Sequence, residues 1–213
     1  YEAVIKYPER FVGAATYDPF CVNVEAVKKR LFDDLGFKIV KFELSTGSGL
    51  MANRPPVYLD GTVMNGCYAH AREKGLTVVM DIGRPNCPCW QVDALASAIS
   101  KYPEVTFVIC HLLAPQRGDV QILSDALQKL KMPNVYFDLA SLANNQKPES
   151  FPYPTASKHL ETAKNTVGAD RLMFGSDMPS ALARDSYTHL KDYIIQSGVF
   201  NEKELQDVFY NTA

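Results

Sequence analysis

The chain has 213 residues, of which 46% are hydrophobic and 22% are charged, and its formal net charge is −2 at pH 7. This length suits one α/β domain or a small barrel that buries a sizeable core. The nearly balanced charge gives no reason to expect a nucleic-acid partner or binding to an anionic membrane. No apolar run approaches the ~20 residues of a membrane span.

The number and positions of the cysteines indicate the redox state of the cellular compartment. The chain holds five, an odd number that falls partly inside expected strands and helices. We therefore expect free thiols in a reducing cytosol, and a cytoplasmic protein. Cys87 and Cys89 lack the second cysteine pair of a structural zinc site. We interpret them as loop cysteines that follow Asp81 and could line a site there.

Short β-branched runs alternate with amphipathic segments, which is typical of repeated β-α units. A helix end is expected at residues 2–7. The expected strands are residues 11–16, 38–44, 76–82, 105–111, 135–139 and 171–176. The expected helices are residues 24–35, 62–74, 91–102, 119–131, 155–167, 183–197 and 201–210. The stretch 45–59, rich in Gly, Pro and Asn, is expected to be a loop over one face.

Alternation along the strands predicts which side chains point inward. In residues 39–45 the apolar side chains would pack under the helices, and Lys41, Glu43 and Ser45 would face the barrel axis. In residues 105–111 we expect one face to carry Phe107, Ile109 and His111, with Cys110 packed outward.

Ionisable side chains stand at the ends of three of these strands. Asp81, His111 and Asp177 each follow a run that is otherwise apolar. Strands that are ionisable only at their carboxyl tips indicate a parallel barrel, whose chemistry sits on that rim. Simpler interpretations remain open, because either aspartate could cap a turn and His111 could be a satisfied core histidine. The convergence of several such tips nevertheless favours an enzyme.

Five stretches carry a resemblance to a known family. Residues 8–16, 78–83, 102–112, 134–140 and 171–179 resemble the amidohydrolase-related family, a branch of the metal-dependent amidohydrolase superfamily. The most specific is the stretch with Asp177, Arg171-Leu-Met-Phe-Gly-Ser-Asp177-Met-Pro179. Members fold as (β/α)8 barrels and include hydrolases, a pyrone dicarboxylate lactonase and non-oxidative decarboxylases.

The resemblance implies an α/β fold of the TIM type, with about six of the eight β/α units in this chain. The expected domain is a single barrel over residues 1–213. Because the chain starts and stops inside expected helices and lacks the His-x-His pair of the family's first strand, we expect the first two strands and the C-terminal end to be missing.

The resemblance also implies roles for the strand-end residues. Asp177 would be a metal ligand and proton shuttle, and His111 a general acid/base or oxyanion partner. Asp81 stands where members usually carry a histidine ligand, so it would be a second carboxylate ligand. The implied cofactor is one divalent metal, Zn²⁺ or alternatively Mn²⁺.

Further polar residues lie at or just past strand ends. We expect Lys41, Glu43, Arg84 and Arg117 to bind substrate. The lysine and the two arginines would suit a carboxylate on that substrate, because they are cations.

The sequence therefore predicts a metal-dependent hydrolase acting on a small organic substrate. Two alternatives stay open: a non-oxidative decarboxylase on the same scaffold, and a non-catalytic barrel that binds a small ligand. Apart from the substrate, the expected partner is a second copy, since homodimers are the commonest oligomers.

Overall fold

The computed structural model describes residues 1–54 and 56–213. In this part of the chain, six parallel strands form one sheet in the order β1-β2-β3-β4-β5-β6. Spatial neighbours are also neighbours in the sequence, as in the wall of a barrel. The strands are β1 (Ala14–Ala15), β2 (Ile39–Glu43), β3 (Thr77–Asp81), β4 (Phe107–Ile109), β5 (Val135–Asp138) and β6 (Leu172–Met173). The expected α/β architecture with six barrel units is confirmed.

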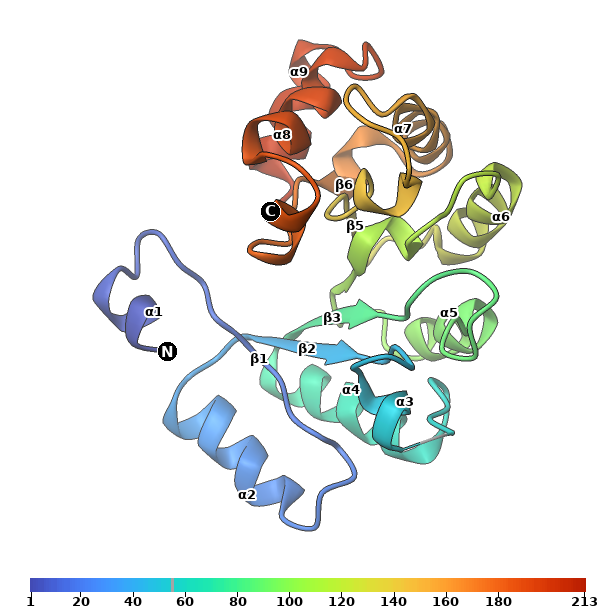
Figure 1. The fold of residues 1–213 in the computed structure, drawn as a ribbon. Coiled ribbons are helices and arrows are strands. Elements are labelled where there is room, and N and C mark those ends of the chain that lie inside the picture. Colours follow the sequence, from blue (N-terminus) through green and yellow to red (C-terminus); the bar gives the residue numbers. More distant parts are fainter. Residues whose placement is uncertain (55) are drawn as a thin grey trace.

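Helices cover the outer face of this sheet (Figure 1). Within the described residues, none is long and apolar enough to cross a lipid bilayer. The α-helices are α1 (Glu2–Lys6), α2 (Val24–Lys28), α3 (Leu50–Asn53), α4 (Thr62–Lys74), α5 (Val92–Ser100), α6 (Val120–Leu130), α7 (Pro154–Val167), α8 (Tyr187–Gln196) and α9 (Glu202–Gln206). The 3-10 and π-helical segments are η1 (Lys29–Asp34), η2 (Cys110–Leu113), η3 (Asn144–Gln146), η4 (Ala169–Arg171), η5 (Ser180–Ala183) and η6 (Asp207–Asn211).

The helices and the sheet enclose the apolar core. On β2 the outward side chains Val40 and Phe42 are at most 2% exposed. Lys41 and Glu43 lie on the opposite, inner face and are partly exposed. This alternation follows the expected one, because successive side chains of a strand point to opposite faces. Burying the outward face in one apolar layer contributes ~25 cal/mol per Å² of apolar surface.

The face assignment of β4 is different from the expected one. Val108 pairs with Val79 of β3 and Tyr136 of β5, so it lies on the inner face. Phe107 and Ile109 therefore point outward, where both are completely buried. The prediction that these two share the inner face with His111 is wrong. The cause is a reversal of the backbone at His111, described below.

The two edge strands are shorter than expected. β1 and β6 each have one pairing neighbour in the described residues, and only two residues of each form ladder pairs. Part of the expected loop 45–59 is helical, since α3 spans Leu50–Asn53. Pro55, also within that expected loop, lies outside the described residues.

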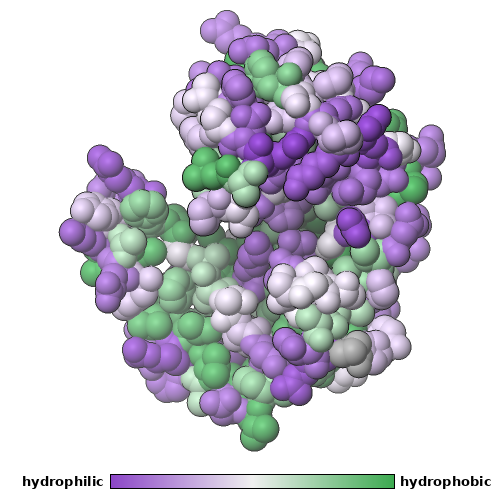
Figure 2. Space-filling view, viewed as in Figure 1, coloured by the Kyte–Doolittle hydropathy of each residue, from purple (hydrophilic) through white to green (hydrophobic). Residues whose placement is uncertain are grey.

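The inner face of the sheet is open on one side. Helix α1 stands away from the sheet at the end of an extended segment, and the C-terminal half lies across from it (Figure 1). The space-filling view in Figure 2 shows the molecule hollowed between this arm and the C-terminal half. The strands thus form a partial barrel whose carboxyl ends face one rim.

Candidate active site

A pocket of about 540 Å³ opens at the carboxyl ends of the strands. It brings together most of the residues that the sequence singled out: Lys41, Glu43, Asp81, Arg84, His111 and Asp177. Arg117 is not among the lining residues and lies exposed before α6. The expected convergence of strand ends therefore occurs, with Arg117 outside it.

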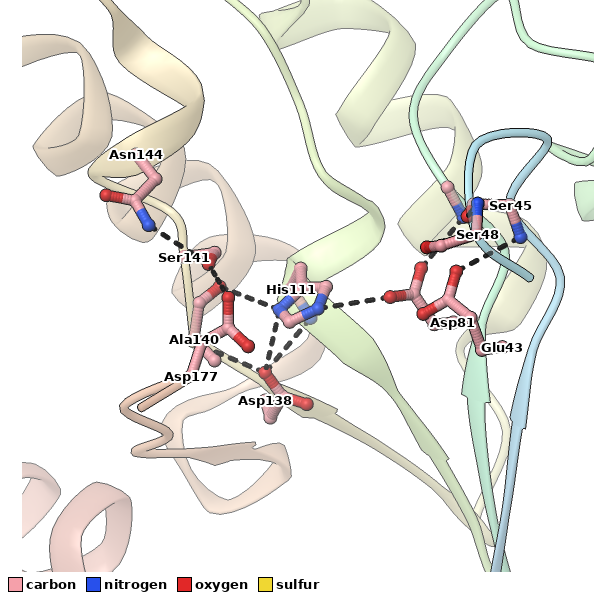
Figure 3. Close-up of polar contacts among 11 residues, drawn as sticks. Glu43, Ser45, Ser48, Asp81, His111, Asp138, Ala140, Ser141, Asn144 and Asp177 are labelled. Carbon is pink, nitrogen blue, oxygen red and sulfur yellow. Dashed lines mark hydrogen bonds and ion pairs between the residues drawn. The ribbon is translucent and has the colours of Figure 1, made fainter. Parts of the chain in front are cut away.

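His111 lies at the centre of a polar network (Figure 3). Its Nε2 is 3.1 Å from Oδ2 of Asp81, the last residue of β3. Its Nδ1 is 3.2 Å from the carbonyl oxygen of Ala140 and 3.8 Å from Oδ1 of Asp138, on and just after β5. The imidazole thus bridges the segments that follow neighbouring strands.

A left-handed turn directs His111 into the pocket. Residues 111–114, which we call the His111 turn, have φ angles of 59°, 49°, 65° and 49°. An extended continuation of β4 would leave residue 111 on the outward face with Ile109. Non-glycine residues avoid this conformation at a cost of roughly 1–2 kcal/mol each. Such a run therefore has to be stabilised by its surroundings.

The partners of His111 indicate its protonation state. The Ala140 carbonyl can only accept a hydrogen bond, and the Asp81 carboxylate accepts when ionised. Both ring nitrogens then act as donors, which describes an imidazolium. Burial alone would lower the pKa of His111, but the hydrogen bond to Asp81 and the charges of Asp138, Asp81 and Asp177 raise it to about 9.

Asp81 is held as a carboxylate beside a second acid. Its Oδ1 accepts the backbone N–H of Gly83 at 2.9 Å. Burial alone would raise the pKa of Asp81, but the hydrogen bond and charge of His111 lower it well below its ordinary range. Glu43 is paired with Asp81 across β2 and β3. Burial first, and then the nearby Asp81 charge, raise the pKa of Glu43. Of the two acids, Glu43 is therefore the more readily protonated.

Asp138 joins the ends of β4 and β5. Its Oδ1 accepts the backbone N–H of His111 at 3.0 Å and that of Ala140 at 2.9 Å. The side chain thereby fixes the first residue of the His111 turn. Cys110 also lies beside it: burial, and then the Asp138 charge, raise the pKa of the Cys110 thiol. The expectation that Cys110 packs outward is wrong, because Val108 and Cys110 share the inner face.

Asp177 reaches the pocket from the segment after β6. Ser141 donates a hydrogen bond to Oδ2 of Asp177. Asn144 in turn donates its Nδ2–H to the Ser141 oxygen at 3.3 Å. Both Asp177 and Ser141 have left-handed φ angles, of 51° and 56°. This chain of donors orients the carboxylate toward the cavity.

Several residues around the pocket have no individual role among the predictions from the sequence, although residues 142–153 are expected to contribute to specificity as a loop. Ser141 and Asn144 follow β5 in a segment where no strand pattern shows direction. Asn145 lines the pocket, and its Nδ2 atom is buried without a partner among the described residues. Cys87 and Cys89 line the pocket as well, as their place after Asp81 suggested.

The described residues do not by themselves fit a metal ion. Within residues 1–54 and 56–213, no three His, Cys, Asp or Glu side chains are grouped closely enough to hold one. The two expected ligands, Asp81 and Asp177, line the same pocket. Their carboxylates already accept hydrogen bonds from Gly83 and Ser141. The contacts of this site therefore support acid–base chemistry.

Solved structures resemble this fold at low identity. No curated protein matches the chain. An amidohydrolase from Burkholderia multivorans with bound zinc is 16% identical, with a TM-score of 0.78 over 99% of this chain and 74% of that one. A probable 2-pyrone-4,6-dicarboxylic acid hydrolase from Acinetobacter baumannii is 16% identical, with a TM-score of 0.75 over 99% and 74%.

A third structure shares the fold. A dihydroxybenzoic acid decarboxylase from Polaromonas with bound manganese is 16% identical, with a TM-score of 0.66 over 99% of this chain and 70% of that one. At such identities these likenesses show the fold, a TIM-type barrel of which this chain forms a part. The family model for amidohydrolases matches residues 1–213. The chain belongs to the amidohydrolase family.

Proposed function

We propose that this chain is a hydrolase that acts on a small, carboxylate-bearing organic substrate in the pocket at the strand ends. The observation that supports this most strongly is the pairing of His111 with Asp81 at 3.1 Å in a pocket that also receives Asp177. A proton donor and a carboxylate then face one cavity. That is the minimum an acid–base hydrolase needs.

His111 would act as the proton donor. Hydrolysis of an ester, lactone or amide builds negative charge on the carbonyl oxygen and then on the leaving group. An imidazolium stabilises the first and protonates the second. Asp81 and His111 both line the pocket. The proton on Nε2 of His111, which faces Asp81, therefore lies at the surface that a bound substrate would contact.

Asp177 would act as the base. Its Oδ2 is occupied by the Ser141 hydroxyl. The other oxygen has no hydrogen bond from any of the described residues and is left to a water or a substrate. A carboxylate held in this way can orient a water molecule and take its proton as the water attacks.

The pocket suits a small anionic molecule. Its volume, about 540 Å³, is within the range of small-molecule sites. Lys41 projects from the inner face of β2, and Arg84 lies exposed at the rim. A carboxylate on the substrate would be bound by these cations.

Metal dependence stays a prediction. The Burkholderia and Polaromonas proteins contain zinc and manganese, and Asp81 and Asp177 are the two carboxylates in this pocket. The described residues supply no third ligand close by. Metal analysis of the purified chain tests the point. Zinc that binds stoichiometrically and is lost with Asp177→Asn would make Asp177 a ligand.

A decarboxylase is the second candidate. Loss of CO2 leaves a carbanion that must be protonated, and the hydrogen-bond acceptors around His111 favour an imidazolium that could supply that proton. The fold likeness to the Polaromonas decarboxylase is in keeping with this alternative. A hydrolase and a decarboxylase would use His111 in the same way, so only the products distinguish them.

The test compares two reactions on one purified protein. Hydrolysis of lactones, esters and amides that carry a carboxylate is measured beside CO2 release from aromatic and unsaturated acids. We expect hydrolysis, abolished by Asp177→Asn and His111→Gln. The matched controls, Asp125→Asn on α6 and His189→Gln on α8, change exposed residues away from the pocket. Release of CO2 alone would favour the decarboxylase, and ligand binding with neither product would favour the non-catalytic barrel.

A further inference from the structure

The His111 turn is stabilised by residues that the proposed chemistry does not use. All of residues 111–114 are left-handed, and none is a glycine. The turn closes on itself through one hydrogen bond, from the Ala114 N–H to the His111 carbonyl at 2.8 Å. A strained conformation of this kind persists only where neighbouring groups over-determine it. Gln116, just after the turn, donates its Nε2–H to the Ala114 carbonyl at 3.2 Å. Within the described residues, two further side chains, from other segments of the chain, contact the backbone of the turn.

The first is Asp138, at the beginning of the turn. Its Oδ1 accepts the His111 N–H at 3.0 Å and the Ala140 N–H at 2.9 Å. One oxygen atom thus fixes the turn relative to the end of β5. The same segment supplies the Ala140 carbonyl, which lies 3.2 Å from Nδ1 of His111.

The second is Trp90, near the end of the turn. Its indole Nε1–H donates to the carbonyl oxygen of Leu113 at 3.3 Å. Trp90 is partly buried against the core. Its own backbone N–H donates to the Cys87 carbonyl at 2.9 Å, in the segment that also forms part of the pocket wall. Trp90 therefore connects the segment after β3 to the segment after β4.

We propose that Asp138 and Trp90 are positioning residues that hold the His111 turn at its first and third residues and so keep the imidazole in the pocket. Without this restraint, residue 111 would follow the alternation of β4 toward the outward face with Ile109. The catalytic value of this restraint rests on the proposed function. The restraint itself is tested without any substrate.

The first experiment removes the indole donor. Trp90→Phe keeps an aromatic ring in the core and deletes the N–H. The matched control, Tyr102→Phe, deletes a hydroxyl that donates to the Asn65 carbonyl at 3.0 Å, on the outer side of the sheet. His111 is one of four histidines, and His111→Gln assigns its ring signals in NMR spectra. We expect Trp90→Phe to shift and broaden those signals and Tyr102→Phe to leave them unchanged.

The second experiment observes the turn from its other end. Trp90 is the only tryptophan, so the protein gives one indole N–H signal. Asp138→Ala removes the acceptor that anchors the turn, whereas Asp138→Asn keeps an oxygen there. We expect indole exchange with solvent to be about fivefold faster in Asp138→Ala, the order expected for one lost hydrogen bond. The increase should be smaller in Asp138→Asn, which also serves if the alanine variant does not fold.

The outcomes separate the two proposals. Identical His111 signals in Trp90→Phe and Tyr102→Phe, or an indole signal indifferent to both changes at Asp138, would overturn the positioning role. If the wild type is active, Trp90→Phe should lower kcat about fivefold with little change in KM. A protein with the expected NMR changes and no activity on any substrate would retain the restraint and refute the proposed function. An active protein without those NMR changes would refute the restraint and leave the proposed function in place.

Discussion

The imidazole of His111 and the carboxylate of Asp81 lie 3.1 Å apart, from Nε2 to Oδ2. The two residues come from the ends of neighbouring strands, and their side chains are only 15% and 11% exposed. Charges so far removed from water are stable only when paired and hydrogen-bonded. The pair therefore fixes the protonation of both residues and relates the fold to the chemistry.

Stability should fall in alkaline solution. The pKa of His111 is raised from its ordinary value of 6.5 to about 9 in the folded chain. A raised pKa means that this contribution to stability is complete below 6.5 and disappears as the pH rises through about 9. Urea unfolding at a series of pH values measures it. In His111→Gln the free energy of unfolding should depend less on pH between 6.5 and about 9. A wild-type free energy of unfolding that does not change over this pH range would contradict the prediction.

Ser141→Ala should reduce activity more than stability. The variant leaves Oδ2 of Asp177 without its donor, so the carboxylate loses its orientation. We expect kcat to fall roughly tenfold, with about 1 kcal/mol lost from the free energy of unfolding. Ser100→Ala, which removes a hydroxyl bonded to the Ser97 carbonyl on α5, is the control. Equal kcat values in the two variants would mean that Ser141 has no role in the site.

Gly175→Ala should destabilise the protein by crowding the segment after β5 that contacts His111. A Cβ at Gly175 would lie 2.9 Å from the Ala140 Cβ, so Ala140, whose carbonyl contacts His111, would have to move. We expect a loss of about 1–3 kcal/mol in the free energy of unfolding. Gly66→Ala is the control, because it lies within α4 with nothing within 4 Å, and there alanine should stabilise by ~0.5–1 kcal/mol. Thermal unfolding measures both, and equal effects would refute the packing argument.

The two arginines predicted to bind substrate should behave differently. Arg84 lines the pocket and Arg117 does not. Arg84→Gln should therefore raise KM for a carboxylate substrate about tenfold, the worth of one charge-assisted hydrogen bond. Arg117→Gln should change KM less than twofold, in the range of an exposed charge. A larger effect at Arg117 would mean that the pocket is not where the substrate binds.

The fold was largely predictable because it depends on period and composition. The alternation in β2 shows directly which side chains face the core, and the glycine after α4 adopts the left-handed conformation that a helix end requires, with φ 62°. Asp81, His111 and Asp177 were found because they end apolar runs. These features are local, so the sequence displays them.

The missed features depend on backbone geometry that the sequence does not show. The residues Cys-His-Leu-Leu-Ala do not predict a left-handed turn, since the run contains no glycine, asparagine or aspartate and positive φ is uncommon for the others. The sequence predicts that the alternation of β4 continues to His111, whereas in the structure it ends at Cys110. The prediction therefore places Cys110 on the wrong face. Ser141 was missed for the same reason, because its position depends on a φ of 56° after β5.

The most direct test of this account is the protonation of His111 in solution. The ¹⁵N chemical shifts of its two ring nitrogens are measured near neutral pH in the wild type and in Asp81→Asn. We predict two protonated nitrogens in the wild type, and a ring that loses one proton in the variant because the carboxylate partner is gone. A neutral His111 in the wild type, or a ring indifferent to the change at Asp81, would contradict the acid–base site proposed for this chain.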